Sequence, residues 1–179
     1  KVEKKIIARG LPASPGAASG KVVFTAEEAE RLNSTMQNTI LVRVETSPED
    51  IHGMHAAKGI LTARGGMTSH AAVVARGMGR PCVSGSSEII IDYEYKQFKS
   101  GELIIKEGDT ITIDGTSGEV ILGTVQTVQP KISGYFSTIM NWSNRFKKLK
   151  IRTNAETEKD SKVAREFGAQ GIGLCRTEH

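Results

Sequence analysis

The chain has few cysteines and few aromatic residues, and each scarcity excludes a class of protein. Only two cysteines occur among 179 residues, and Cys82 and Cys175 belong to no C-x-x-C pair. The sequence therefore offers no disulfide framework and no zinc signature, which fits a reducing compartment. Aromatic residues make up 5% of the chain, too few to act as stacking platforms for nucleic acid. We therefore expect no nucleic-acid partner and interpret the basic cluster at residues 145–152 as a solvated linker.

Long apolar runs are lacking as well. No run approaches the ~20 residues that span a bilayer, and residues 1–7 do not resemble a signal peptide, so we expect no membrane partner. The first residue is Lys1 rather than methionine, so we expect the chain to begin inside a longer protein. We expect an intracellular, cytoplasmic location by default. An organelle such as a plastid or glycosome stays open, because a targeting segment could lie upstream.

What the sequence does contain is a series of short segments rich in Val, Ile and Thr and bounded by Gly, Asp or Ser, which predicts strands. A tight hairpin turn is predicted at residues 114–118. Helices are predicted after Thr25, from Ser47-Pro48 onward and after Ser69. This mixture predicts a compact α/β domain over residues 1–125. The predicted strands are 21–24, 39–44, 59–62, 82–84, 103–105, 110–113 and 119–122, and the predicted helices are 26–32, 48–57 and 70–78.

The pattern changes from about Val125. Residues 126–148 contain the only tryptophan and most of the basic cluster, which indicates a helical connector. A strand at 150–154, a helix at 157–168 and a strand at 171–175 then predict one β-α-β unit with parallel strands. One such unit cannot cover both faces of its sheet, and a complete (β/α)₈ barrel needs ~250 residues. We therefore interpret residues 149–179 as the beginning of a larger domain.

The segment around His70 is the most informative part of the sequence. Gly65 and Gly66 predict a turn, and Thr68 and Ser69 carry hydroxyl groups suited to capping a helix. His70 then falls in the first turn of that helix, where unpaired N–H groups and the helix dipole favour an anion. Such a position suits a histidine that binds or carries a phosphate.

The spacing alone leaves three roles open for His70. It could be a structural residue at an interface. It could bind a metal ion if the fold brought His52 and His55 beside it. It could be a nucleophile, because a helix N-terminus opposes protonation of the ring and stabilises a phosphate once it is attached. His52 and His55 are otherwise interpreted as surface residues of one helix.

A resemblance favours the nucleophile. Residues 65–85, Gly-Gly-Met-Thr-Ser-His-Ala-Ala-Val-Val-Ala-Arg-Gly-Met-Gly-Arg-Pro-Cys-Val-Ser-Gly, resemble the phosphohistidine signature of the phosphoenolpyruvate-utilising enzymes, and among them the pyruvate phosphate dikinases. Residues 10–20, 60–64, 152–156 and 171–179 support the resemblance. Two positions depart from the pattern. Enzyme I and phosphoenolpyruvate synthase have arginine where Met67 stands, and dikinases often have cysteine where Ser86 stands.

The resemblance implies a fold and an activity. It implies a swivelling β/β/α phosphohistidine domain over residues 1–125, a helical swivel over 126–148, and the first β-α-β unit of a (β/α)₈ barrel over 149–179. That barrel would bind phosphoenolpyruvate and pyruvate. His70 would receive phosphate from ATP, first as a pyrophosphoryl and then as a phosphoryl group. It would pass the phosphoryl group to pyruvate, giving phosphoenolpyruvate, AMP and pyrophosphate in a reversible reaction.

The resemblance also assigns individual residues. Arg176 would bind the phosphate of the substrate, a task suited to a guanidinium group. Thr68 matches a regulatory phosphorylation site of plant dikinases, with simple capping of the helix as the alternative. Gly65, Gly66 and Ser69 would form the supporting loop.

The remaining expectations concern cofactors and partners. Mg²⁺ would be bound by other domains of the polypeptide, with no metal site in this segment, and a monovalent cation is a further candidate. The partners would be the nucleotide-binding and barrel domains of the same polypeptide. The ligands would be ATP, AMP, phosphate, pyrophosphate, pyruvate and phosphoenolpyruvate, and a homodimer would form through the barrel.

Three further expectations complete the sequence-based picture. Arg64 and Arg76 could touch phosphate, although a surface ion pair is favoured for Arg76. Cys82 is expected to be a small core residue. A non-catalytic module that binds an anionic partner through the basic linker and the His70 loop remains an alternative function, and so does a phosphoenolpyruvate synthase.

Overall fold

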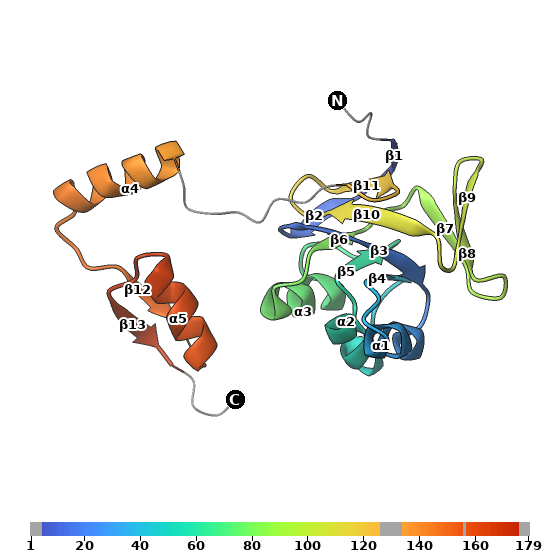
Figure 1. Cartoon of the computed structure of the whole chain (residues 1–179), viewed down its shortest axis with the longest axis horizontal. Coiled ribbons are helices and arrows are strands. Elements are labelled where there is room, and N and C mark those ends of the chain that lie inside the picture. The colour runs from blue at the N-terminus through green and yellow to red at the C-terminus, as the bar shows by residue number, and fades with distance from the viewer. Residues whose placement is uncertain (1–4, 126–133, 156, 176–179) are drawn as a thin grey trace. The chain divides into compact units, whose positions relative to one another are not determined.

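The computed structural model describes residues 5–125, 134–155 and 157–175. The chain divides into two compact units, residues 1–128 and 129–179 (Figure 1). In the part that the structure describes, no helix is both long and apolar enough to cross a membrane.

A large mixed sheet forms the centre of the first unit. Its four middle strands, β3 to β6, pair in parallel, and the strands at both margins pair antiparallel. The antiparallel hairpin of β10 and β11 confirms the turn predicted at residues 114–118. In spatial order the strands are β1 (Ile6–Arg9), β11 (Glu119–Leu122), β10 (Thr110–Asp114), β3 (Ala17–Val23), β4 (Thr39–Arg43), β5 (Gly59–Thr62), β6 (Cys82–Ser84) and β2 (Leu11–Ser14).

Each face of this sheet is covered by a different layer. Ile40 and Val42 of β4 lie in a core with Phe98 of a second, antiparallel sheet made of β7 (Ile89–Asp92), β8 (Gln97–Ser100) and β9 (Leu103–Lys106). Leu41, between them, lies in the core formed with the helices. Because neighbouring residues of a strand point to opposite faces, β4 contributes to both cores. The helices are α1 (Ala26–Ser34), α2 (Ile51–Ala56) and α3 (His70–Met78), which Figure 1 shows gathered on one side of the large sheet. The predicted α/β class with β/β/α layering is confirmed.

The helices begin where the capping residues predict. The hydroxyl of Thr25 accepts a hydrogen bond from the Glu28 N–H at 3.2 Å, which starts α1. Ser47 and Asp50 form a capping box before a 3₁₀ turn (Pro48–Asp50) that leads into α2. The left-handed Gly79 ends α3.

Four strands were not predicted from the sequence, namely β1, β2, β7 and β8. Strand β2 contains Pro12, which argues against a central strand but is tolerated here because β2 lies at the edge of the sheet. In β8 only Phe98 is buried, so the segment resembles a polar loop. Strand β3 also begins at Ala17 rather than at residue 21.

The second unit contains α4 (Gly134–Phe146), β12 (Arg152–Asn154), α5 (Glu158–Glu166) and β13 (Gly171–Leu174). Strands β12 and β13 pair in parallel, which confirms the predicted β-α-β unit. Thr157 and Asp160 form a capping box at the start of α5. Of the predicted connector, residues 126–133 lie outside the described residues, and the division at residues 125 and 148 stays a prediction.

Candidate functional site

The site around His70 lies where two parallel strands end. Because β4 and β5 are parallel neighbours, with Arg43 opposite Thr62, their carboxyl ends meet at the same edge of the sheet. The pairing continues into the loops, since the Arg64 N–H donates to the Val44 carbonyl at 2.9 Å. The loop after β4, residues 44–47, therefore lies beside the loop after β5, residues 63–69.

The loop before His70 is held by its own hydrogen bonds. The Thr62 hydroxyl donates to the Arg64 carbonyl at 2.7 Å, and the Ser69 N–H donates to the Gly66 carbonyl at 3.1 Å. Gly65 has φ +103°, and a Cβ at this position would lie 2.8 Å from the Ser69 Cβ. Any other residue at position 65 would be strained.

Helix α3 begins at His70 itself. The Ser69 hydroxyl accepts a hydrogen bond from the Ala72 N–H at 3.4 Å, so Ser69 is the N-cap. Thr68 is exposed and does not cap the helix, so the capping alternative for Thr68 is wrong. His70 is half-buried, and its imidazole lies at the helix end that favours an anion.

One contact orients the imidazole. The Nδ1 atom of His70 lies 2.9 Å from Oγ1 of Thr46, in the loop after β4. When the hydroxyl accepts, Nδ1 holds the ring proton and the lone pair of Nε2 is available for attack. Sequence reasoning missed Thr46, although the parallel order of β4 and β5 places the two loops side by side.

His70 also lines a small pocket. Its volume is about 230 Å³, and both of its charged residues, Glu45 and Arg64, are exposed. A Cβ built at Gly66 would meet nothing within 4 Å, so the turn is open at this residue. An anionic group in this pocket would meet the Arg64 cation and the imidazole, and it would also lie near the Glu45 carboxylate. Its lining residues are Glu45, Thr46, Arg64, Gly65, Ser69, His70 and Ala71.

Among the described residues, Arg76 does not form the expected surface ion pair. Its guanidinium donates to the Ala13 carbonyl at 2.8 Å and to the Met67 carbonyl at 2.7 Å. These two bonds tie α3 to strand β2 and to the loop before His70. A planar group with several fixed donors suits this bridging of two backbone segments.

The metal-ligand alternative for His70 is wrong. His52 and His55 lie on α2, are exposed, and line a different, open pocket. Across residues 5–125, 134–155 and 157–175, no group of three or more His, Cys, Asp or Glu residues could hold a metal ion. Cys82 is fully buried, as expected, and burial raises the pKa of its thiol to about 12.

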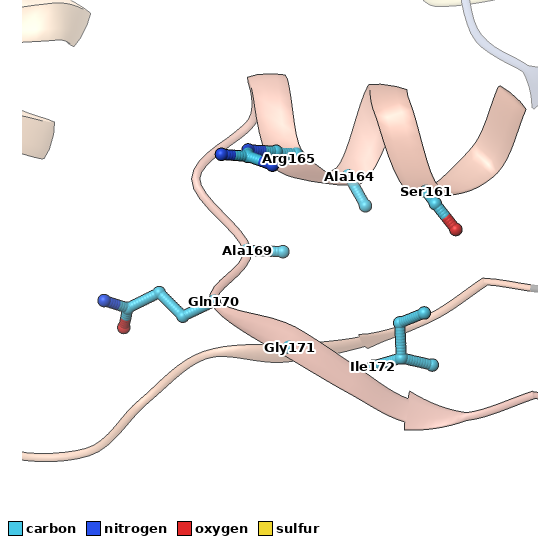
Figure 2. Close-up of a pocket in the computed structure, with 7 residues that line it drawn as sticks. All are labelled: Ser161, Ala164, Arg165, Ala169, Gln170, Gly171 and Ile172. Carbon is cyan, nitrogen blue, oxygen red and sulfur yellow. The ribbon is translucent and has the colours of Figure 1, made fainter. Parts of the chain in front are cut away.

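In the second unit, Arg176 lies outside the described residues. A pocket of about 400 Å³ lies between α5 and β13, lined by seven residues that include Arg165, Gln170 and Ile172 (Figure 2). Gln170 and Gly171 are at the amino end of β13. The carboxyl end, where parallel β/α folds place their ligands, is the opposite end of this strand.

Two family models match the chain. The model described as "PEP-utilising enzyme, mobile domain" matches residues 35–118, which include the loop and helix of His70. The model described as "PEP-utilising enzyme, PEP-binding domain" matches residues 130–179.

Curated relatives match almost the whole chain. A pyruvate, phosphate dikinase of Rhizobium meliloti (strain 1021) is 57% identical over 176 residues, which are 98% of this chain and 20% of that protein. The chloroplastic pyruvate, phosphate dikinase 1 of Arabidopsis thaliana is 57% identical over 98% of this chain and 18% of that protein. The dikinase of Clostridium symbiosum is 57% identical over 98% of this chain and 20% of that protein. The chain thus spans about a fifth of the length of the curated relatives it matches.

Proposed function

The chain belongs to the PEP-utilising enzymes, and we propose that it is the phosphohistidine carrier of a pyruvate, phosphate dikinase with the beginning of its PEP-binding domain. The observation that carries this proposal is the setting of His70. Its Nδ1 contacts Thr46, its ring stands at the N-terminus of α3, and a pocket opens beside it.

The proposed reaction consists of three transfers. First, Nε2 of His70 bonds to the β-phosphorus of ATP and the bond to AMP breaks. Second, inorganic phosphate takes the terminal phosphoryl group and leaves as pyrophosphate. Third, the enolate oxygen of pyruvate, formed by loss of a methyl proton, takes the remaining phosphoryl group and Nε2 departs. Each transfer is a substitution at phosphorus, and the covalent intermediate divides one difficult exchange into easier steps.

The residues around His70 have definite tasks in this scheme. The Thr46 hydroxyl accepts a hydrogen bond from the Nδ1–H group of His70. This bond leaves the lone pair on Nε2, and it stabilises the ring when Nε2 carries a phosphoryl group. The helix N-terminus and Arg64 favour the anion on the carrier. Arg76 and Ser69 hold the loop in the shape that this requires.

Other tasks fall outside the described residues. We propose that Mg²⁺ is bound by further domains of the polypeptide, as in the sequence-based expectation. The nucleotide and pyruvate sites would also lie there, with Arg176 at the pyruvate site. Residues 126–148 would let the carrier move between the two sites, and a homodimer would form through the barrel.

Thr68 is a candidate for regulation of this activity. It is exposed, lies two residues before His70, and has no capping task. A phosphate here would add about two negative charges beside the attacking ring and repel an anionic donor.

A segment exchange tests the proposed function. This chain would replace the matching segment of the 57% identical dikinase of Rhizobium meliloti, and the chimera would be assayed for phosphoenolpyruvate formation from ATP, phosphate and pyruvate. We expect the chimera to form phosphoenolpyruvate, which would show that this chain supplies a competent phosphohistidine carrier to a dikinase. Intact-mass spectrometry after addition of phosphoenolpyruvate would show one acid-labile phosphate.

His70→Asn is the matched control. It should abolish both the activity and the mass increase while the chimera remains folded, because asparagine lacks the ring nitrogen that is proposed to carry the phosphoryl group. Full activity in the His70→Asn chimera would overturn the proposal and favour a binding module instead.

A further inference from the structure

The short loop that carries Thr46 is fastened at both of its ends. This loop, residues 44–47, connects β4 to the 3₁₀ turn before α2. A hydrogen bond of 2.9 Å joins this loop to His70, so the orientation of the imidazole depends on where the loop holds the Thr46 hydroxyl. Groups that fix the two ends of the loop therefore act on His70 at a distance.

At the first end, a side chain from the small sheet holds the backbone. The Val44 N–H donates to the hydroxyl of Tyr93 at 2.8 Å. Tyr93 lies in the turn between β7 and β8, where the Asp92 carboxylate accepts hydrogen bonds from two backbone N–H groups. The Tyr93 hydroxyl thus reaches the loop only two residues before Thr46.

The ring of Tyr93 is itself held in place. Phe24, which is buried, meets it edge to face at 6.5 Å between ring centroids. The guanidinium of Arg43 lies 5.1 Å from the ring centroid, a cation–π contact. Tyr93 is 43% exposed, and these two contacts orient the ring that presents its hydroxyl to Val44.

At the second end, a buried carboxylate holds the loop. Asp50 accepts a hydrogen bond from the Ser47 N–H at 2.9 Å and is 5% exposed. Arg43 lies 3.5 Å from the same carboxylate as an ion pair, and it donates to the Phe24 carbonyl at 3.1 Å. One arginine therefore connects the two fastenings.

We propose that Tyr93 is a positioning residue for His70. Its hydroxyl holds Val44, and through the backbone it places the Thr46 hydroxyl against Nδ1 so that Nε2 keeps the lone pair. The small sheet β7–β9 would thereby contribute to the chemistry and not only to the core. This inference deepens the proposed function and rests on it for its consequence in phosphoryl transfer.

Tyr93→Phe is the variant that isolates this role. It removes one oxygen and keeps the ring that contacts Phe24 and Arg43, so the fold should be preserved. Tyr95→Phe in the same turn is the matched control, since Tyr95 is 71% exposed. Thr46→Val, which replaces the hydroxyl by a methyl group, gives the reference for complete loss of the contact.

The first readout is the position of the ring proton, which is independent of phosphoryl transfer. In the 179-residue chain labelled with ¹⁵N-histidine, nitrogen chemical shifts at about pH 8.5, where free imidazole is neutral, distinguish the two tautomers. The His70 signal is assigned by its loss in His70→Asn. We expect the Nδ1–H form in the wild type and the Tyr95 variant, and a mixture of tautomers in the Tyr93 and Thr46 variants.

The second readout is chemical phosphorylation by phosphoramidate, a small donor that needs no further domain. We expect phosphate on Nε2 in the wild type. In Tyr93→Phe we expect a rate lower by about 10-fold, because a small misplacement of a reacting group is costly, and a larger share of phosphate on Nδ1. Tyr95→Phe should behave as the wild type.

The outcomes separate the two proposals. If Tyr93→Phe keeps the wild-type tautomer and rate while Thr46→Val changes both, Tyr93 does not position His70. If Thr46→Val also changes neither, the route through Thr46 is wrong. A wild-type chain that takes no phosphate counts against the proposed function, while the tautomers still decide the positioning. Asp50→Asn tests the fastening at the other end of the loop by the same two readouts.

Discussion

Two parallel β-α-β units of this chain have similar local signals and very different burial. In β4–α2–β5 a Ser47 capping box precedes the helix and Gly59 begins the second strand; in β12–α5–β13 the corresponding residues are Thr157 and Gly171. Every residue of β5 is buried, whereas every residue of β13 is exposed. Capping and strand patterns therefore specify the elements, and the layers packed on them determine which strands become core.

The same difference affects the chemistry at the carboxyl edges. In the first unit, the loops after β4 and β5 are bound to each other, and this brings Thr46 to His70. A site of this kind needs two neighbouring loops, both fixed by covered strands. In the second unit the described residues supply one parallel pair, β12 and β13. None of the residues in these two strands is buried.

The largest expected effect comes from removing a core side chain in the covered unit. Leu41 of β4 has no exposed surface and packs against the helices, so Leu41→Ala should lower the free energy of unfolding of the first unit by about 3 kcal/mol. Ile172 of β13 is 47% exposed, and Ile172→Ala should cost less than about 1 kcal/mol.

Amide hydrogen exchange followed by mass spectrometry measures each unit separately. The comparison between the units would fail if Ile172→Ala raised amide exchange in the second unit as much as Leu41→Ala raises it in the first. That result would mean that Ile172 contributes as much to the stability of its unit as a buried core residue does.

The two glycines that begin the second strands form a matched pair with a smaller expected effect. A Cβ at Gly59 would lie 2.7 Å from the Ile113 Cδ1 and 3.2 Å from the Ala18 Cβ, so Gly59→Ala should destabilise the first unit by about 2 kcal/mol through overpacking. At Gly171 the nearest atom would be the Arg152 Cγ at 3.7 Å, an ordinary contact. Gly171→Ala should therefore be neutral or stabilising by up to about 1 kcal/mol. Urea unfolding of both variants, with the same exchange readout, checks the pair.

The sequence predicts local features of both units but not the contacts between segments. The caps at Thr25, Ser47 and Ser69 follow from side-chain chemistry within one turn, and the structure confirms all three. Thr46 could not be chosen from its neighbours in sequence, because its role depends on β4 lying beside β5. Arg76 was misjudged for the same reason, since one of its two acceptors, the Ala13 carbonyl, lies far away in the sequence.

The two cysteines differ in burial, so they should differ in how they affect the pH dependence of unfolding. Burial raises the pKa of the Cys82 thiol to about 12, above its value in an unfolded chain. The neutral thiol therefore stabilises the fold below about pH 9, and this contribution is lost as the pH rises toward 12, by at most about 1.4 kcal/mol per pH unit. Cys82→Ala should flatten this part of the pH dependence of unfolding relative to the wild type.

Cys175 provides the control, because it is exposed. Cys175→Ala should leave the alkaline slope as it is in the wild type. A thiol reagent should modify Cys175 in the native chain and reach Cys82 only on unfolding. Rapid native modification of Cys82 would show that the core beside α3 opens readily.

The smallest expected effect separates stability from function. Ser69→Ala and Thr157→Ala each remove an N-cap, of α3 and α5 respectively, and each should cost about 1 kcal/mol in its own unit. Only Ser69→Ala should also slow phosphorylation of His70 by phosphoramidate, because Ser69 fixes the turn from which the imidazole projects. Thr157→Ala is the control, because it removes the same kind of cap in the other unit. Equal phosphorylation rates in the two variants would mean that the cap of α3 stabilises the helix without positioning the imidazole.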